Sequence, residues 1–441
     1  MLKTLRDAFK VKDIRTKFFF TLLMIIVIRI GCQLPVPGFN SAKFQEWFSG
    51  LQQSSDAFNL LAAFTGGSFE KMSLLALNIT PYITSSIIMQ LLTIAIPALE
   101  EMQREGGEGR KKIASLTRYV TVGLALIEAA AMTISFGNQG LLEKYNALNV
   151  ITAISALTAG SAFVMWIGER ITEKGIGNGI SIILLINIIS RIPQDMAALF
   201  KQFVAGKRIA KQILAIAIIL AILVLMIMLV VVLNAGIRKI PVQYARRSQG
   251  SKLSGGTASN IPVRINTAGV MPIIFASSLM QTPGIVASLF GYDGSGTGAG
   301  AFILRLLSSR FWINKTYPIY SLGLLIYVIL VILFAYFYTS ITFNPIEIAD
   351  NLKKSNGFIP GYRPGKPTSE YLEKILNAII FIGAIGLVIV GILPYIFYGV
   401  FNAEVTFLGT SLIIIVSVII ETLNQVESMM LVRNYKGFLN Q

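Results

Sequence analysis

Residues 64–93 read FTGGSFEKMSLLALNITPYITSSIIMQLLT and are the most informative part of the chain. The segment is long and apolar enough to cross a bilayer, yet a Gly-Gly pair lies near its start and Pro81 in its middle. At 100° per residue its polar side chains share an arc of about 140°, which Ile79 and Ile83 flank. A membrane segment with such an arc faces other helices or a water-filled space. We therefore expect the function to depend on this face, whose polar residues are Asn78, Tyr82, Ser85, Ser86, Gln90 and Thr93.

The composition is that of a polytopic membrane protein. Of the 441 residues 54% are hydrophobic and 14% charged, and the mean hydropathy is +0.68, whereas a soluble protein carries about 25% charged residues. The chain has no histidine and a single cysteine, Cys32, which excludes imidazole chemistry and an internal disulfide. We expect no cofactor and no catalysis. The net charge of +16 is attributed to basic cytoplasmic loops, so no direct DNA binding is expected.

Ten apolar segments predict an all-α fold with ten transmembrane helices. If the ten helices divide into two halves of five, the odd number gives the halves opposite orientations in the membrane, as in an inverted repeat. The predicted halves are 1–193 and 194–441. The second and seventh segments hold equivalent places and both combine proline with polar residues, the pattern of a transport pathway. The predicted spans are 18–34, 74–96, 116–136, 151–168, 180–193, 212–236, 268–290, 318–341, 375–398 and 407–426.

The distribution of basic residues predicts that both termini are cytoplasmic. Of the 38 Lys and Arg residues, 26 lie in the termini and connections assigned to the cytoplasmic side and 11 on the opposite side, while Arg29 lies within the first span. The connection 191–211 is an exception, since it carries five basic residues on the predicted outer side.

Three features near the informative segment have competing interpretations. Ile79 and Ile83 either pack in a bundle core or form a hydrophobic constriction that blocks water and ions by dewetting. Ala57–Met72 is either an outer loop or a re-entrant segment that pivots on its glycines. The sequence GIGNGI at 175–180 lacks the lysine of a phosphate loop, so we interpret it as a tight turn.

Two cytoplasmic connections, 237–267 and 343–374, are long and basic. Such loops set membrane topology and contact anionic lipids. Prolines and glycines between 360 and 367 make a stiff tip that presents Arg363, which suits docking to a partner, and RNA is one acidic candidate.

Six segments resemble, in order, the signatures of the SecY family, the central subunits of bacterial protein translocation channels. Together they extend over nearly the whole chain, which makes the resemblance specific. They are TPYITSSIIMQLLT (80–93), EGGEGRKKIASLTRY (105–119), ITEKGIGNGISI (171–182), NTAGVMPIIFASS (266–278), NPIEIADNLKKSNGFIPGYRPGKPT (344–368) and FLGTSLIIIV (407–416).

The resemblance implies a protein-conducting channel in the bacterial plasma (inner) membrane, with two inverted five-helix halves around a central hourglass pore. Secretory proteins cross the pore, and membrane proteins leave it through a lateral gate. The implied partners are the subunits SecE and SecG, the ATPase SecA, the ribosome, unfolded preproteins and signal peptides.

The resemblance also implies roles for individual residues. The ring at the pore waist matches Ile79, Ile83, Ile180, Leu184, Ile274 and Ile414, of which Leu184 departs from the usual isoleucine. The plug, at about 57–72, includes Phe64, Gly66, Gly67 and Phe69. The lateral gate includes Ile87, Gln90 and Thr282, and the docking surface for SecA and the ribosome includes Arg246, Arg247, Lys353, Lys354 and Arg363.

Two other classes of function remain as alternatives. Inverted halves with broken helices are also typical of ion-coupled secondary transporters for small solutes. However, such transporters place carboxylates near the broken helices, and neither 74–96 nor 268–290 contains an acidic residue. A membrane assembly scaffold without conduction is the third class.

Overall fold

The computed structural model describes residues 9–54, 62, 64–204, 209–244, 247–249, 252–254, 258–289, 298–313, 317–401 and 410–439. The chain forms two compact units. The first comprises Met1–Phe200, Thr282–Leu304 and Val418–Gln441, and the second Lys201–Gln281 and Arg305–Ser417. Three helices have residues in both units: α11 (Met271–Leu289), α12 (Ala299–Leu307) and α16 (Thr410–Leu439).

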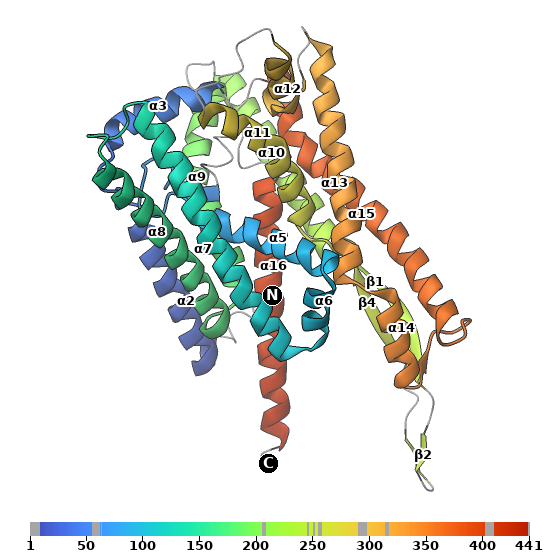
Figure 1. Ribbon diagram of the computed structural model, residues 1–441. Helices are drawn as coiled ribbons and strands as arrows, with labels where there is room; N and C mark the ends of the chain where they lie inside the picture. The colour runs from blue at the N-terminus through green and yellow to red at the C-terminus, as the bar shows by residue number, and fades with distance from the viewer. Residues whose placement is uncertain are drawn as a thin grey trace. The chain divides into compact units, whose positions relative to one another are not determined.

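The first unit is a bundle of long helices (Figure 1). In it α7 packs against both α5 and α8, and α2 packs against α8. The buried stripe of α7 consists of Thr117, Thr121, Ala125, Ala129 and Thr133, one residue per turn, and such small side chains let helices approach closely. The helices of this unit are α2 (Lys12–Gly31), α3 (Ser41–Ser54), α5 (Thr80–Ala95), α6 (Pro97–Arg104), α7 (Gly107–Asn138), α8 (Ala147–Lys174) and α9 (Gly179–Leu199).

The second predicted span differs from its expected form. Pro81 lies in the first turn of α5, where its missing N–H costs nothing, so it begins a helix and does not interrupt one. Residues 64–79 precede this helix as turns and bends, apart from a short helical stretch at 64–65. The break lies at the other end, where α5 and α6 meet at an angle of 105°.

The fifth predicted span is longer than expected. Asn178 caps α9 by accepting hydrogen bonds from the N–H groups of Ile180 (3.1 Å) and Ser181 (3.4 Å). The helix continues through Pro193 to Leu199, so the predicted end at residue 193 is wrong, and a π-helical turn, Phe200–Val204, follows. The preceding glycine-rich segment, 175–178, is a bend that leads into α9, in keeping with the predicted tight turn.

The second unit combines helices with a small sheet. Its strands are β1 (Ile237–Tyr244), β4 (Ala258–Arg264) and β5 (Gly357–Phe358), in the order β4-β1-β5 and antiparallel throughout. The sequence analysis did not predict these strands. A separate hairpin pairs β2 (Arg247–Gln249) with β3 (Lys252–Ser254). The helices are α10 (Ile209–Ala235), α13 (Ser321–Thr342), α14 (Pro345–Lys354) and α15 (Lys366–Phe401), with 3-10 turns at Ser309–Phe311 and Pro318–Tyr320.

The predominantly helical, polytopic architecture is confirmed, although the second unit adds a small sheet to the predicted all-α fold. Within the described ranges seven helices are long and apolar enough to cross a membrane, or eight if the bent pair of α5 and α6 forms one span. A helix also occupies each of the ten predicted spans, with α2 in the first and α11 in the seventh. The division into halves at residue 193 stays a prediction.

Candidate functional site

The turns between residues 72 and 78 are tied by hydrogen bonds to the chain that follows α2 and to α8. The Val36 N–H donates to the Met72 carbonyl at 3.0 Å, and the Leu74 N–H donates to the Leu34 carbonyl at 2.8 Å. On the α8 side, Ser161 Oγ donates to the Asn78 carbonyl at 3.1 Å. This part of the segment is therefore fixed to the chain that follows α2 and to α8.

Phe69 anchors the segment in an aromatic cluster. Its side chain is 1% exposed, and its ring centroid lies 5.4 Å from that of Phe48, 5.8 Å from Phe44 and 6.3 Å from Phe136, all edge to face. Burial of such a side chain contributes about 1.5–3 kcal/mol, and aromatic pairs add about 0.5–1.5 kcal/mol. The anchor packs the segment against α3 and α7.

Polar contacts hold the beginning of the segment against α2 and α9. Arg29, near the end of α2, donates from Nη1 to Asn187 Oδ1 at 3.2 Å and from Nη2 to the Gly66 carbonyl at 3.3 Å. Asn187 of α9 donates from Nδ2 to the Phe64 carbonyl at 3.0 Å. Gly66 has φ +63°, and a Cβ there would lie 2.8 Å from Arg29 Nη1 and 2.9 Å from Asn187 Cα. Glycine is therefore required for this close approach.

Two contacts of charged side chains lie next to these polar contacts. Arg191 Nη1 of α9 lies 3.3 Å from Glu70 Oε2, with side chains 11% and 37% exposed. Lys71 Nζ donates to Gln33 Oε1 at 2.7 Å. These four residues and Arg29 line a cavity of about 250 Å³. The predicted plug residues Phe64, Gly66, Gly67 and Phe69 all belong to this anchored segment, residues 57–61 and 63 lie outside the described residues, and the role as a plug stays a prediction.

Four of the predicted ring residues lie in the first unit. Ile79 directly precedes α5 and is buried, and the Ile83 N–H donates to its carbonyl at 3.0 Å. Ile180 and Leu184 occupy the first two turns of α9, half-buried and buried respectively.

The other two ring residues are buried in the second unit, Ile274 on α11 and Ile414 on α16. All six side chains are apolar and at least half-buried, which suits core packing as well as a constriction. The ring stays a prediction.

The predicted lateral-gate residues lie on α5 and α11. Gln90 Nε2 donates to Ser86 Oγ at 3.3 Å on its own helix. Ser85 Oγ donates to the Thr117 carbonyl of α7 at 2.8 Å, so part of the polar arc holds α5 against α7. Ile87 is half-buried and Thr282 exposed. Their role in a gate stays a prediction.

The two basic loops are joined in one folded element of the second unit. β1 of the first loop pairs with β5 of the second, with Gln243 opposite Phe358. Buried Ile240 and Val242 of β1 pack in a core with Ile359 and Leu372. The sheet thus gives the second loop a fixed base.

The predicted docking residues lie around this base. Arg363 is exposed, and its carbonyl accepts a hydrogen bond from Thr368 Oγ1 at 2.8 Å. Lys353 and Lys354 are exposed at the end of α14. Arg247 begins β2, and Arg246 lies outside the described residues. Docking stays a prediction.

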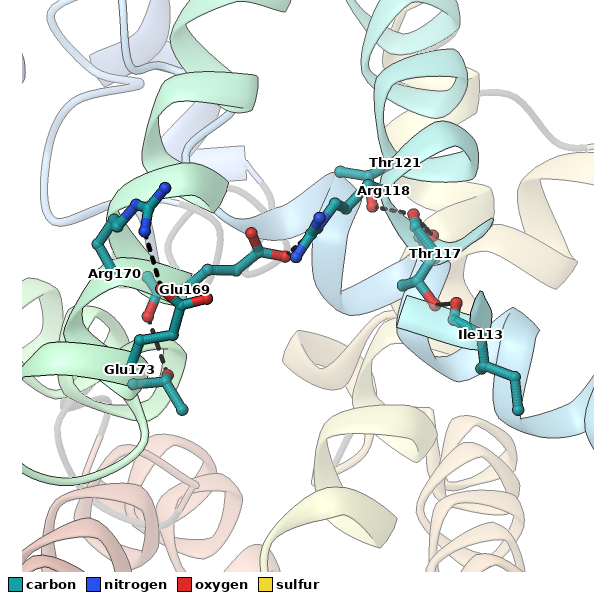
Figure 2. Close-up of polar contacts among 10 residues, drawn as sticks. Ile113, Thr117, Arg118, Thr121, Glu169, Arg170 and Glu173 are labelled. Carbon is teal, nitrogen blue, oxygen red and sulfur yellow. Dashed lines mark hydrogen bonds and ion pairs between the residues drawn. The ribbon is translucent and has the colours of Figure 1, made fainter. Parts of the chain in front are cut away.

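An ion pair links α7 and α8 (Figure 2). Arg118 Nε donates to Glu169 Oε1 at 2.6 Å, and the side chains point toward each other from the two helices. On α8 a second pair, Arg170 with Glu173 at 2.9 Å, is exposed and lies within a single helix. The first pair therefore contributes to helix packing, whereas the second is a surface feature.

Sequence reasoning missed the partners of three polar residues. Arg29 and Asn187 were evident as polar groups within apolar spans, and such groups normally find partners in the protein. Glu70 was evident as a charge next to the glycines. Nothing in the sequence indicated that these residues and Arg191 meet around one segment.

The chain is similar to known proteins over its full length. The family model SecY matches residues 73–423. The protein translocase subunit SecY of Bacillus subtilis (strain 168) is 39% identical over 447 residues, covering 100% of both chains.

Solved structures share the fold. One is a SecY whose plug domain is described as stabilising the closed state of the translocation channel and maintaining a membrane seal (TM-score 0.63, 19% identity, 94% of this chain and 92% of that one). Another is Sec61 in the canine ribosome-channel complex from the endoplasmic reticulum (TM-score 0.60, 17% identity, 94% and 92%). Taken with the family match and the full-length identity, these findings show that the chain belongs to the SecY family.

Proposed function

We propose that the chain is the channel subunit of a bacterial protein translocase. The observation that carries this proposal is the 39% identity to a translocase subunit over the whole of both chains. Secretory proteins cross a passive pore, and apolar segments leave sideways into lipid through a gate between helices. An apolar ring suits this task, because it binds no side chain strongly and can close around a chain of any composition.

The energy for transport comes from partners. The sequence contains no GxxxxGK[ST] motif for nucleotide binding. We assign the driving force to SecA with ATP or to a translating ribosome. Both bind through the two basic loops, 237–267 and 343–374, including the tip that presents Arg363. The ribosome-bound relative Sec61 supports the second assignment by analogy. SecE and SecG are the proposed companion subunits, and unfolded preproteins with signal peptides are the substrates.

The proposed location is the bacterial plasma membrane, with both termini in the cytoplasm. The excess of Lys and Arg in the connections on that side supports this orientation. Anionic lipids are the expected neighbours of the basic loops.

A reconstituted transport reaction tests the proposal. The chain is incorporated into liposomes with SecE and SecG, and SecA, ATP and a secretory precursor are added. We expect the precursor to become protected from external protease only when ATP is present. Absence of protection, in a reaction in which the Bacillus subtilis relative protects the same precursor, would contradict the proposal.

The solute-transporter alternative is tested in the same vesicles. It predicts solute counterflow without SecA or ATP. The full-length similarity to a protein translocase does not favour it.

A further inference from the structure

We propose that Arg29, Glu70, Asn187 and Arg191 form a reversible clasp that holds residues 64–70 of the predicted plug against α2 and α9 and so keeps the channel closed. The inference rests on the proposed function, because it assigns positioning residues to the gate of that channel. The four residues come from three separate parts of the first unit and meet only around residues 64–70.

The first argument for a clasp concerns the direction of the contacts. Arg29 and Asn187 bind the carbonyls of Gly66 and Phe64, so these contacts depend on where the backbone of the segment lies. The bond between Arg29 and Asn187 presents both side chains to the segment together. A cation within an apolar span is costly unless it is paired or hydrogen-bonded. Because Arg29 lies within the first span and finds its hydrogen bonds at the segment and at Asn187, its position favours the closed arrangement.

The second argument concerns reversibility. Breaking a fully buried ion pair strongly destabilises a protein, because it leaves a buried charge without a partner. The pair of Glu70 and Arg191 is instead only partly buried: Glu70 is 37% exposed and Arg191 11% exposed, and both line a cavity of about 250 Å³ that opens beside the segment. Water can therefore solvate both charges when the segment leaves, which makes this contact a releasable one.

The third argument concerns the contrast within the segment. Residues 72–74 are held by two backbone hydrogen bonds to the chain after α2, and Gly160 of α8 approaches the Leu74 carbonyl so closely that a Cβ would lie 1.9 Å from it. Residues 64–70 are held by side-chain contacts, namely the clasp on the α2 and α9 side and buried Phe69 on the α3 and α7 side. The glycines at 66 and 67 have φ +63° and +80°. Residues 72–74 are thus tethered by backbone hydrogen bonds, whereas residues 64–70 depend on side chains that can separate from them.

Exchanging the charges of Glu70 and Arg191 tests the clasp. The measured quantity is the ion conductance of planar bilayers that contain the chain purified together with SecE and SecG. Glu70→Arg and Arg191→Glu each place like charges together, and we expect each to raise resting conductance by at least about fivefold, the lower range for coupling between sites. The double exchange restores an opposite pair and should return conductance to near the wild-type value. A purely structural role for the two residues does not predict such rescue.

Arg170 and Glu173 provide the matched control, because they form an exposed pair elsewhere in the first unit (Figure 2). Arg170→Glu and Glu173→Arg should leave resting conductance unchanged. Equal leak from these variants, or a double exchange at 70 and 191 that leaks as much as the single changes, would overturn the clasp.

A ring variant separates failure of the clasp from failure of the proposed function. Ile83→Asn should raise conductance if a pore exists at all, while Ile127→Asn on the exposed face of α7 should not. If Ile83→Asn leaks and Glu70→Arg does not, the clasp is wrong and the channel stands. If neither leaks, the proposed pore itself is contradicted.

Discussion

At the scale of single residues, Gly66 and Gly67 are neighbours with similar backbone angles and different surroundings. Both have positive φ, +63° and +80°. A Cβ at Gly66 would meet Arg29 and Asn187, whereas a Cβ at Gly67 would have nothing within 4 Å. Replacement by alanine therefore introduces the same kind of backbone strain at both positions, about 1–2 kcal/mol, but a steric conflict only at the first.

We predict that Gly66→Ala raises resting ion conductance several-fold more than Gly67→Ala. The added methyl group displaces Arg29 or Asn187 from the segment and weakens the closed state, while Gly67→Ala measures the effect of backbone strain alone. Conductance recordings on both variants, with equal amounts of complex in the bilayer, make the comparison. Equal conductance would show that the close contact at Gly66 does not matter for closure.

Sequence reasoning identified the type of residue at this scale but not its partner. The glycines, Glu70 and Asn187 were all conspicuous in the sequence. Arg29 and Asn187 are 158 positions apart, and no periodicity connects side chains across such a distance. Contacts of this kind depend on how the helices pack.

At the scale of elements, the two basic loops form one structure. The order β4-β1-β5 joins them, and the alternation of buried Ile240 and Val242 with exposed neighbours is a strand signal that the sequence already contained. The basic charge of the loops does not reveal this signal, because charge is compatible with a strand as well as with an irregular loop. The fixed base explains how a turn-rich tip can present Arg363 in a defined position.

We predict that Arg363→Glu lowers SecA-stimulated transport about tenfold, which corresponds to the loss of one charge-assisted contact of about 1.5 kcal/mol. Lys201→Glu is the matched control, since Lys201 is also exposed in the same unit but lies in the connection predicted on the outer side. Precursor protection and SecA affinity should both decrease for Arg363→Glu and stay near wild type for Lys201→Glu. Unchanged SecA affinity in the first variant would refute its docking role.

Helix boundaries show a similar limit of sequence reasoning. Pro81 was expected to interrupt a span, but it begins α5, since proline suits the first turn of a helix as well as it disrupts the interior. Pro193 was expected to lie at the end of a span, and it lies within α9. The sequence predicted that these spans exist, whereas their ends depend on capping and on packing.

At the scale of the whole molecule, hydropathy and the order of motifs were sufficient for the fold class and the family. Each of the ten predicted spans contains a helix, and the family match extends over residues 73–423. Composition alone did not distinguish a channel from a solute transporter, because both build pathways from broken helices. The resemblance of six motifs made that distinction.

We predict a topology in which Lys112 faces the cytoplasm and Lys144 the outside. Both side chains are exposed. After Cys32→Ala removes the single native thiol, Lys144→Cys in intact cells should react with a membrane-impermeant maleimide, and Lys112→Cys should react only after permeabilisation. The opposite pattern would reverse the orientation and contradict cytoplasmic termini.

The central claim is that a translocating polypeptide passes the ring of apolar residues. A photoreactive amino acid is placed at position 83, or at position 127 on the exposed face of α7 as a control, and a precursor fused to a tightly folded domain is arrested during transport. We predict crosslinks from position 83 to the arrested precursor, and none from position 127. Efficient arrest without a crosslink from position 83, or with equal crosslinking from both positions, would contradict passage through the ring.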